Sequence, residues 1–115
     1  MWRLIHLVLT FPPSINRLWR TVKGRVIKSE EYRKWIAANQ VYGLKTIGGK
    51  FKLTMQCSPP DKRRRDIDNL PKATLDLLQA IGAVVDDCNL EHLDLSWKRD
   101  LAPGVYCWIQ PMEET

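Results

Sequence analysis

The sequence predicts an α+β fold, in which a small mixed or antiparallel sheet of about four strands carries two helices on one face. Three stretches, at 3–11, 50–57 and 90–99, alternate apolar and polar residues with the period of a strand. Two other stretches repeat apolar residues at helical spacing. A chain of 115 residues is long enough to bury one modest core, so we expect residues 1–115 to form a single domain.

The first half of the chain predicts two strands, separated by a basic ribbon and a helix. The strand at 3–11 is rich in branched side chains and stops at two consecutive prolines. A basic loop or ribbon follows, with Gly24 as its turn. Ser29 is placed to cap a helix that has two acids in its first turn and continues to about Gln40. A pair of glycines then separates this helix from the strand at 50–57.

The second half of the chain predicts one helix and two strands. Apolar residues recur at helical spacing from Leu70 onward, and Gly82 stands where a helix should stop. Because Pro71 is tolerated only in the first turn, the helix begins at Leu70 or one residue earlier. The strand at 90–99 and a last strand at 105–110 complete the order strand, helix, strand, helix, strand, strand.

Charge is divided unevenly along the chain, whose formal net charge is +5. Residues 1–65 contain 15 of the 18 lysines and arginines but only three of the 13 acids. A basic half suits a polyanion such as nucleic acid, because phosphate neutralisation releases counterions, and an acidic half beside it suits metal ions. The alternative is that the fold pairs the two halves and cancels their charge across one surface.

The apolar run at the N-terminus contains Arg3 and His6 and is too short to span a membrane. It also lacks a small-residue cleavage site, so we expect a soluble, cytoplasmic protein with no membrane partner. The three cysteines, Cys57, Cys88 and Cys107, show no C-x-x-C spacing. Their odd number and their spacing predict buried thiols in a reducing compartment rather than disulfides or a zinc site.

The segment RRRDIDN, at 63–69, places three arginines directly before two aspartates that stand one residue apart. We expect Asp66 and Asp68 to lie in extended backbone before the helix, where side chains two residues apart point to the same side. Mg²⁺ prefers oxygen ligands, and a third carboxylate, from Asp86 or Asp87, would complete such a site. The alternative is that Asp66 and Asp68 are a helix cap and its solvated neighbour, and that Asp86 and Asp87 form a turn.

Lys72 follows Asp68 by four residues and falls on the side of the helix opposite the apolar stripe. A lysine there can neutralise charge on a scissile phosphate or on a leaving oxygen. Its alternative role is that of an ordinary surface lysine, paired with Asp68 or Asp76. Trp19, in the basic loop, is the tryptophan that we consider for stacking on a base. The other tryptophans are expected in the core: Trp2, Trp35, Trp97 and Trp108.

Residues 63–87, RRRDIDNLPKATLDLLQAIGAVVDD, resemble the signature of the RusA family of Holliday junction resolvases. The shared pattern is an arginine-rich run, Asp-x-Asp-Asn-Leu, a lysine four residues after the second aspartate, and Gly-x-x-x-Asp-Asp. A second stretch, PPSINRLWR at 12–20, resembles the Pro-Pro-Ser region near the N-terminus of that family. Together with the chain length and the order of elements, the resemblance spans most of the chain.

This resemblance implies a Mg²⁺-dependent homodimer, with Mn²⁺ as a substitute metal, that binds four-way branched DNA by its structure and nicks two strands symmetrically. It implies that Asp66, Asp68 and Asp87 are metal ligands and that Lys72 is the essential lysine. Asp86 occupies the neighbouring acidic position, and its contribution stays open. Arginines of the run would contact phosphates, which positions DNA without reading its sequence. The residues expected at the DNA are Arg63, Arg64, Arg65, Arg17, Arg20 and Asn69.

The sequence therefore predicts a structure-selective endodeoxyribonuclease that resolves Holliday junctions in DNA recombination and repair. One alternative is a non-catalytic branched-DNA-binding protein of phage origin, in which the acids serve as caps. This alternative is disfavoured because acids beside DNA phosphates repel the ligand, and a protein that only binds has no chemical reason to keep them there. Another alternative is a nuclease with other substrates, such as flaps or replication forks.

Overall fold

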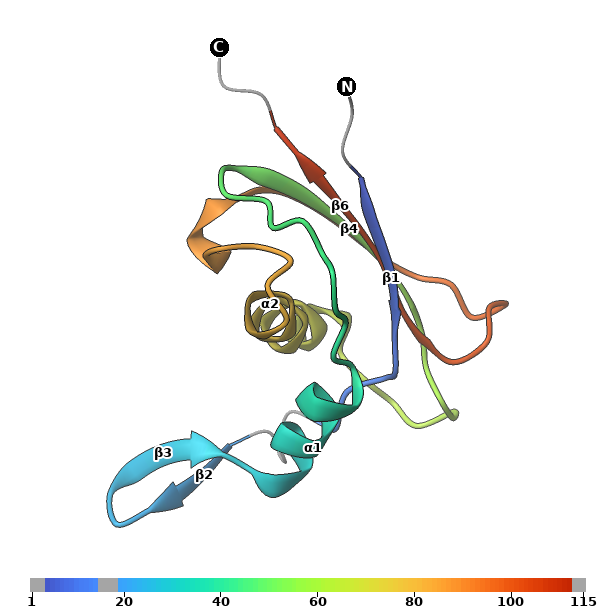
Figure 1. Ribbon diagram of the computed structural model, residues 1–115. Helices are drawn as coiled ribbons and strands as arrows, with labels where there is room; N and C mark the ends of the chain where they lie inside the picture. The colour runs from blue at the N-terminus through green and yellow to red at the C-terminus, as the bar shows by residue number, and fades with distance from the viewer. Residues whose placement is uncertain (1–3, 15–18, 113–115) are drawn as a thin grey trace.

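Four strands form one mixed sheet, in the order β1-β6-β4-β5, in a computed structural model of the chain that describes residues 4–14 and 19–112 (Figure 1). Strand β6 runs antiparallel to both β1 and β4, whereas β4 and β5 are parallel. The strands are β1 (Ile5–Leu9), β4 (Phe51–Ser58), β5 (Leu90–Trp97) and β6 (Gly104–Pro111). The predicted α+β class, with a mixed sheet of four strands, is confirmed.

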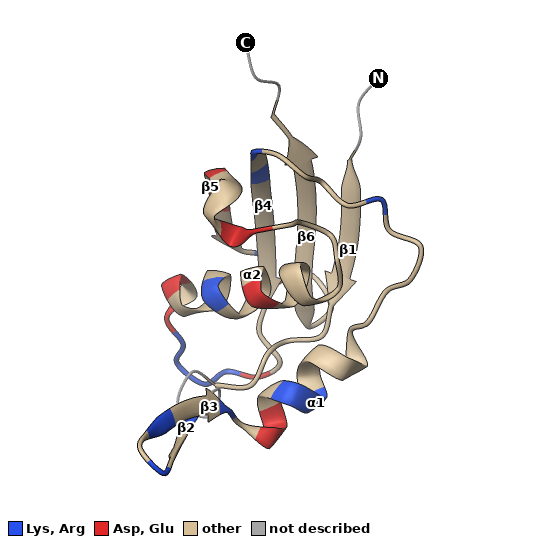
Figure 2. Cartoon of the chain, turned by 60° about the vertical axis from the view of Figure 1, so that its left-hand side comes forward, with Lys and Arg blue, Asp and Glu red and all other residues tan. Residues whose placement is uncertain are grey.

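Two helices lie on the same side of this sheet, α2 (Leu70–Ala80) across its face and α1 (Glu30–Ala38) toward one end (Figure 1 and Figure 2). Single turns of 3-10 helix precede α2 and β5, namely η2 (Ile67–Asn69) and η3 (Asp87–Asn89). None of the described helices has the length and hydropathy needed to cross a membrane.

The basic stretch after residue 18 forms a separate two-stranded sheet. Strands β2 (Trp19–Val22) and β3 (Arg25–Lys28) pair antiparallel, so that the turn lies at Lys23 and Gly24. Both turn residues have positive φ, 51° and 75°, which suits a two-residue hairpin turn. The predicted ribbon with Gly24 at its turn is therefore confirmed.

The core lies between α2 and the sheet. Alternate residues of β4 and β6 are buried on the side that faces the helices, and α2 contributes the apolar stripe predicted from its spacing. The buried residues are Leu53, Met55 and Cys57 on β4, Val105, Cys107 and Ile109 on β6, and Leu70, Ala73, Leu77 and Leu78 on α2. Because full burial of one large apolar side chain contributes about 1.5 to 3 kcal/mol, this contact fixes the position and rotation of α2.

Helix α2 is the crossover between the parallel strands β4 and β5. Gly82, at φ 81°, takes the left-handed conformation that ends the helix, as the sequence predicts. Beyond it Ala83 and Val84 are buried, and Val84 pairs with Ile47. Since β4 leads into α2, the loop at 59–65 and the start of α2 lie at the carboxyl end of β4.

Helix α1 begins at the predicted cap. The backbone N–H of Tyr32 donates to Ser29 Oγ at 3.1 Å, as expected of an N-cap serine. The helix ends at Ala38 rather than near Gln40, because Asn39 leaves the helical conformation and acts as its C-cap.

Asn39 joins α1 to the end of β1. Its amide nitrogen donates to the carbonyl oxygen of Trp35 at 2.7 Å and to the hydroxyl of Thr10 at 3.0 Å, and its oxygen accepts from the backbone N–H of Thr10 at 3.0 Å. The ring N–H of Trp35 also donates to the carbonyl oxygen of Thr10 at 2.8 Å. Asn39 is buried, so these bonds satisfy a polar side chain inside the protein. They determine where the chain leaves β1, and hence where residues 11–14 lie.

Two of the three cysteines are buried as predicted. Burial raises the pKa of Cys57 to about 11 and that of Cys107 to about 12. The prediction is wrong for Cys88, which is exposed because it lies in the surface turn η3. Among the tryptophans predicted in the core, Trp35 is buried, Trp97 and Trp108 are half-buried, and Trp2 lies outside the described residues.

Replacing Asn39 with alanine is expected to lower the free energy of unfolding by about 2 kcal/mol, because it leaves the buried carbonyl oxygen of Trp35, and the backbone N–H and hydroxyl of Thr10, without their partner. Urea unfolding at fixed pH measures the change. The neighbouring Gln40→Ala is the control, since Gln40 is exposed and its side-chain amide donates to the carbonyl oxygen of Ile36 at 3.1 Å in an exposed contact. It should change stability by less than about 0.5 kcal/mol. Equal losses in both variants would contradict the role given to Asn39.

Candidate active site

The two aspartates before α2 lie on different local backbones. Asp66 is extended, with φ −91° and ψ 123°, but Asp68 lies within the 3-10 turn η2. The backbone N–H of Asn69 donates to the carbonyl oxygen of Asp66 at 3.3 Å and closes that turn. The prediction of extended backbone is therefore wrong for Asp68, because the chain starts to wind before α2 begins. In a 3-10 helix, with about three residues per turn, side chains two residues apart diverge, so the backbone does not direct the two carboxylates together.

The Asp86-Asp87 pair lies at the start of η3. The carboxylate of Asp86 accepts from the backbone N–H of Cys88 at 2.9 Å and caps this turn. That bond, with smaller contributions from the side chains of Cys88 and Asp87, holds the pKa of Asp86 below its usual value. The backbone N–H of Asp87 donates to Gln79 Oε1 at 3.2 Å. Because Asp86 is engaged as a cap, Asp87 is the better candidate ligand of the pair.

The three acids expected to bind metal lie on two segments, Asp66 and Asp68 at η2 and Asp87 at η3. Both η2 and η3 contact α2, and η2 also contacts β5, so the two acidic turns neighbour the same helix. Among residues 4–14 and 19–112, however, no three His, Cys, Asp or Glu side chains are close enough together to hold a metal ion. Asp66, Asp68 and Asp87 thus supply the oxygen donors that Mg²⁺ prefers, but not its octahedral arrangement.

Lys72 is exposed on α2 and pairs with Asp76. Its Nζ lies 3.6 Å from Asp76 Oδ1, which is one of the two pairings that the sequence allows. Asp76 Oδ2 accepts a hydrogen bond of 2.6 Å from the hydroxyl of Tyr32 in α1. Burial, reinforced by Asp76, raises the pKa of Tyr32 far above its usual value, so the hydroxyl remains a donor. Tyr32 therefore orients Asp76, and Asp76 holds Lys72.

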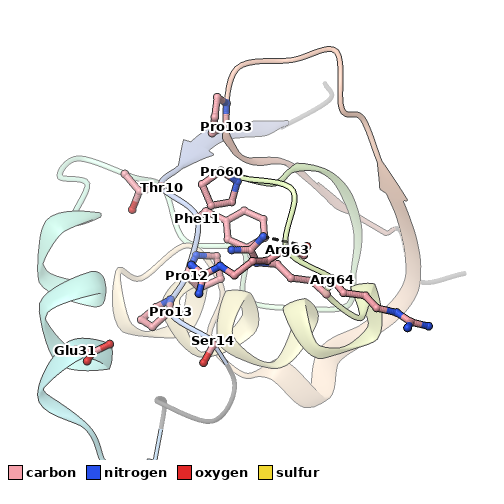
Figure 3. Close-up of a pocket in the computed structure, with 11 residues that line it drawn as sticks. Thr10, Phe11, Pro12, Pro13, Ser14, Glu31, Pro60, Arg63, Arg64 and Pro103 are labelled. Carbon is pink, nitrogen blue, oxygen red and sulfur yellow. Dashed lines mark hydrogen bonds between the residues drawn. The ribbon is translucent and has the colours of Figure 1, made fainter.

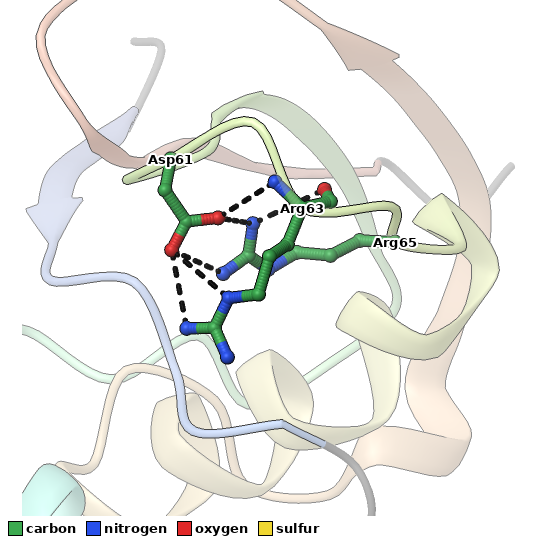
Figure 4. Close-up of polar contacts among 3 residues, drawn as sticks. All are labelled: Asp61, Arg63 and Arg65. Carbon is green, nitrogen blue, oxygen red and sulfur yellow. Dashed lines mark hydrogen bonds and ion pairs between the residues drawn. The ribbon is translucent and has the colours of Figure 1, made fainter.

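The arginine run includes an acid that sequence reasoning missed. Asp61 accepts hydrogen bonds from the side chains of both Arg63 and Arg65 (Figure 4). Arg64, between them, is exposed and forms no hydrogen bond or ion pair with the residues that the structure describes. The three arginines predicted to contact DNA are therefore not equivalent. The sequence signal for this contact is the spacing, since Asp61 stands two residues before Arg63 and four before Arg65.

A cavity of about 710 Å³ lies beside the arginine run (Figure 3). Its lining includes residues 11–14 after β1 and residues 63–65. A second cavity, of about 230 Å³, shares part of that lining and adds Asp66 and Asn69. Two predicted site residues and the arginines therefore border adjoining hollows, whose apolar walls and cationic rim suit a strand of nucleic acid.

The basic hairpin lies at the same end of the molecule as the arginine run (Figure 1 and Figure 2). Arg20, predicted to contact DNA, is exposed on β2, and Lys23 and Arg25 are exposed beside it. Arg17 and the side chain of Trp19 lie outside the described residues. The hairpin extends the positive surface of the run, so both can meet one polyanion.

A basic hairpin beside an arginine run, and adjoining cavities lined by that run and by Asp66, define the class of site expected in a protein that processes nucleic acid. Residues 10–110 match the family described as Endodeoxyribonuclease RusA. The chain is 39% identical over 90 residues to the crossover junction endodeoxyribonuclease of enterobacteria phage 82, and the aligned residues cover 74% of this chain and 75% of the relative. It is 38% identical over 89 residues to RusA of Escherichia coli K12, covering 73% and 74% of the two chains. The chain belongs to the RusA endodeoxyribonuclease family, as its resemblance to that family predicts.

Replacing Tyr32 with phenylalanine is expected to lower the free energy of unfolding by about 1.5 to 3 kcal/mol, because the hydrogen bond to the Asp76 carboxylate is lost. Chemical denaturation measures the loss. Tyr106→Phe is the matched control, since its hydroxyl donates to the carbonyl oxygen of Ala102 at 2.8 Å in an exposed contact. That variant should lose less than about 1 kcal/mol. A Tyr32 variant as stable as its control would refute the link between the helices.

Proposed function

We propose that this chain is a structure-selective endodeoxyribonuclease that resolves four-way DNA junctions in DNA recombination and repair. The observation that carries the proposal is membership of the RusA family together with a complete set of motif residues, Asp66, Asp68, Lys72 and Asp87. Relatives with 39% and 37% identity are named crossover junction endodeoxyribonucleases. Asp66 and Asn69 line one cavity together with Arg64 and Arg65, which supports a site where a DNA strand is both held and cut.

In this proposal the basic residues position the DNA. Arg64 and Arg20 are exposed and can contact phosphates directly. Asn69 borders the smaller cavity beside Asp66, so its amide can donate to the same strand. These contacts place the backbone of the strand next to the acids without reading its bases.

Mg²⁺ is the metal that we propose for the site, with Mn²⁺ as a substitute and with Asp66, Asp68 and Asp87 as ligands. When bound, such an ion activates water and stabilises charge on phosphoryl oxygens. Asp66 and Asp68 are exposed and Asp87 is half-buried, so all three carboxylates are accessible. To serve one ion, η2 and η3 must approach each other. Repulsion between the carboxylates opposes this approach unless a cation lies between them.

Lys72 is proposed to neutralise charge on the scissile phosphate or on the leaving oxygen. Its present partner Asp76, at 3.6 Å, forms with it a surface ion pair that contributes little to stability. Lys72 can therefore leave Asp76 at small cost. Side chains on a helix lean toward its N-terminus, which is the end of α2 where Asp66 and Asp68 lie.

We further propose that the protein acts in the cytoplasm as a homodimer of single-domain protomers, residues 1–115. Each protomer offers one active site, and two strands of a four-way junction are related by a two-fold axis. A two-fold dimer can therefore nick both strands at equivalent positions.

A non-catalytic branched-DNA-binding protein of phage origin is the second candidate. The observation that favours it is the separation of the three acids in the described part of the chain, since separated carboxylates do not hold an ion. The role of Asp86 as a cap also fits this candidate. Cleavage of DNA distinguishes the two.

A labelled synthetic four-way junction, incubated with the protein and Mg²⁺, is expected to receive paired symmetric nicks. Linear duplex and a replication fork should remain intact, and a chelator should abolish nicking, because the chemistry depends on the metal. A junction that is bound but never cut in Mg²⁺ or Mn²⁺ would establish the second candidate. Cutting of the fork would point instead to a nuclease of broader specificity.

Asp68→Asn is expected to lower the rate of junction cleavage by about 100-fold or more while junction binding is kept or strengthened. The variant loses a proposed ligand and also a negative charge close to phosphate. Asp94→Asn is the control, because it makes the same chemical change at an exposed residue paired with Lys52 on β4. It should cleave like the unmodified protein. If binding collapses in Asp68→Asn, the residue is structural and the site is misplaced.

A further inference from the structure

Two of the three arginines in the run converge on one carboxylate (Figure 4). Asp61 accepts from the backbone N–H of Arg63 at 2.9 Å, and from its Nε and Nη2 at 3.2 and 3.1 Å. Asp61 also accepts from Nη1 and Nη2 of Arg65, at 2.7 and 3.2 Å. Arg64 takes no part in this contact. One acid therefore determines where two guanidinium groups lie and leaves the third in solvent.

Arg65 is the more firmly held of the two arginines. Its side chain is 20% exposed, whereas that of Arg63 is 79% exposed. Its guanidinium lies over the ring of Phe11, 5.3 Å from the ring centroid, and Nη1 also donates to the carbonyl oxygen of Arg63 at 3.4 Å. Phe11 follows β1 and the arginine run follows β4, so Arg65 joins two loops that line the larger cavity.

The Asp61 carboxylate makes this arrangement electrostatically stable. Two guanidinium groups at one place repel each other, and a carboxylate between them offsets that repulsion. Hydrogen bonds from Arg65, then from Arg63, hold the pKa of Asp61 well below its usual range, so the group stays ionised at neutral pH. The planar fork of arginine fixes direction as well as distance in such bonds.

We propose that Asp61 is a positioning residue for the DNA strand, which immobilises Arg63 and Arg65 at the rim of the cavity so that phosphates meet a preformed set of donors. The inference rests on the proposed cleavage of DNA junctions and adds to it a residue that acts through the arginines. A carboxylate close to DNA phosphates weakens binding. More accurate placement of the DNA strand offsets this loss of affinity, since a shift of about 1 Å in a reacting group can slow a reaction by about 100-fold.

Loss of Asp61 should therefore change binding and cleavage in opposite directions. In Asp61→Asn a negative charge disappears and both guanidinium groups are released. Each additional phosphate contact should steepen the dependence of log affinity on log salt by about 0.9. Cleavage should slow, because the strand is no longer held in one register.

The first measurement requires no cleavage. Dissociation constants for a junction and for a linear duplex are determined at several salt concentrations, in chelator, for the unmodified protein, Asp61→Asn and Asp94→Asn. Asp61→Asn should bind linear duplex about five-fold tighter or more, with a steeper salt dependence and a smaller preference for the junction. Asp94→Asn, which removes the same charge from the sheet, should match the unmodified protein.

The second measurement is single-turnover cleavage of the junction with protein in excess. Asp61→Asn should cut about 10-fold more slowly or worse, and its nicks should spread to neighbouring positions. Arg65→Lys keeps the charge but loses the fork, and it should behave in the same way. The double variant should be no slower than the worse single variant, because both changes break one contact.

Unchanged cleavage by Asp61→Asn, or additive losses in the double variant, would overturn the proposal. Weaker binding that accounts for slower cleavage would also overturn it, since the carboxylate would then only maintain the fold of the loop. If the unmodified protein binds junctions but nicks none, the proposed function fails. The salt measurements would still decide whether Asp61 restrains the arginines.

Discussion

The burial of one face of α2 against β4 and β6 is the contact on which the rest of the structure depends. Because β4 and β5 are parallel, the chain must cross the sheet between them, and α2 makes that crossing. The buried stripe of α2 sets the rotation of the helix, so that Lys72 faces solvent and Asp76 faces Tyr32. The turns η2 and η3 then lie against the same helix. Hydrophobic packing of α2 therefore determines where the acidic turns η2 and η3 lie.

Charge on this fold is partly cancelled and partly concentrated. Lys50, just before β4, pairs with Glu91 on β5, and Lys52 on β4 pairs with Asp94 on β5, both at 3.3 Å. The basic and acidic halves of the chain therefore do meet on one surface. The hairpin and the arginine run have a different role, because they lie together at the other end of the sheet, where the run borders a hollow (Figure 2). There Asp61 limits the freedom of two arginines before DNA arrives. Side chains ordered in advance lose less entropy on binding.

Interactions between residues close along the chain made much of the protein predictable. Hydrophobic periodicity and capping act over a few residues, so the helix capped by Ser29 and the helix that stops at Gly82 were both predicted. The same holds for the hairpin turn at Gly24 and for the family motif. The direction of the strands was left open between mixed and antiparallel. It is settled by the crossover through α2, which makes β5 parallel to β4.

The sequence by itself determined the α+β class, most elements and membership of the family, since each depends on local patterns. Only the tertiary structure decided how distant segments meet. The hydroxyl of Tyr32 reaches an aspartate 44 residues away, and Arg65 packs on Phe11 from the end of another strand. The 3-10 turn at Asp68 and the exposure of Cys88 also follow from how the chain enters and leaves α2. No local pattern specifies such contacts, because they depend on the packing of one helix against the whole sheet.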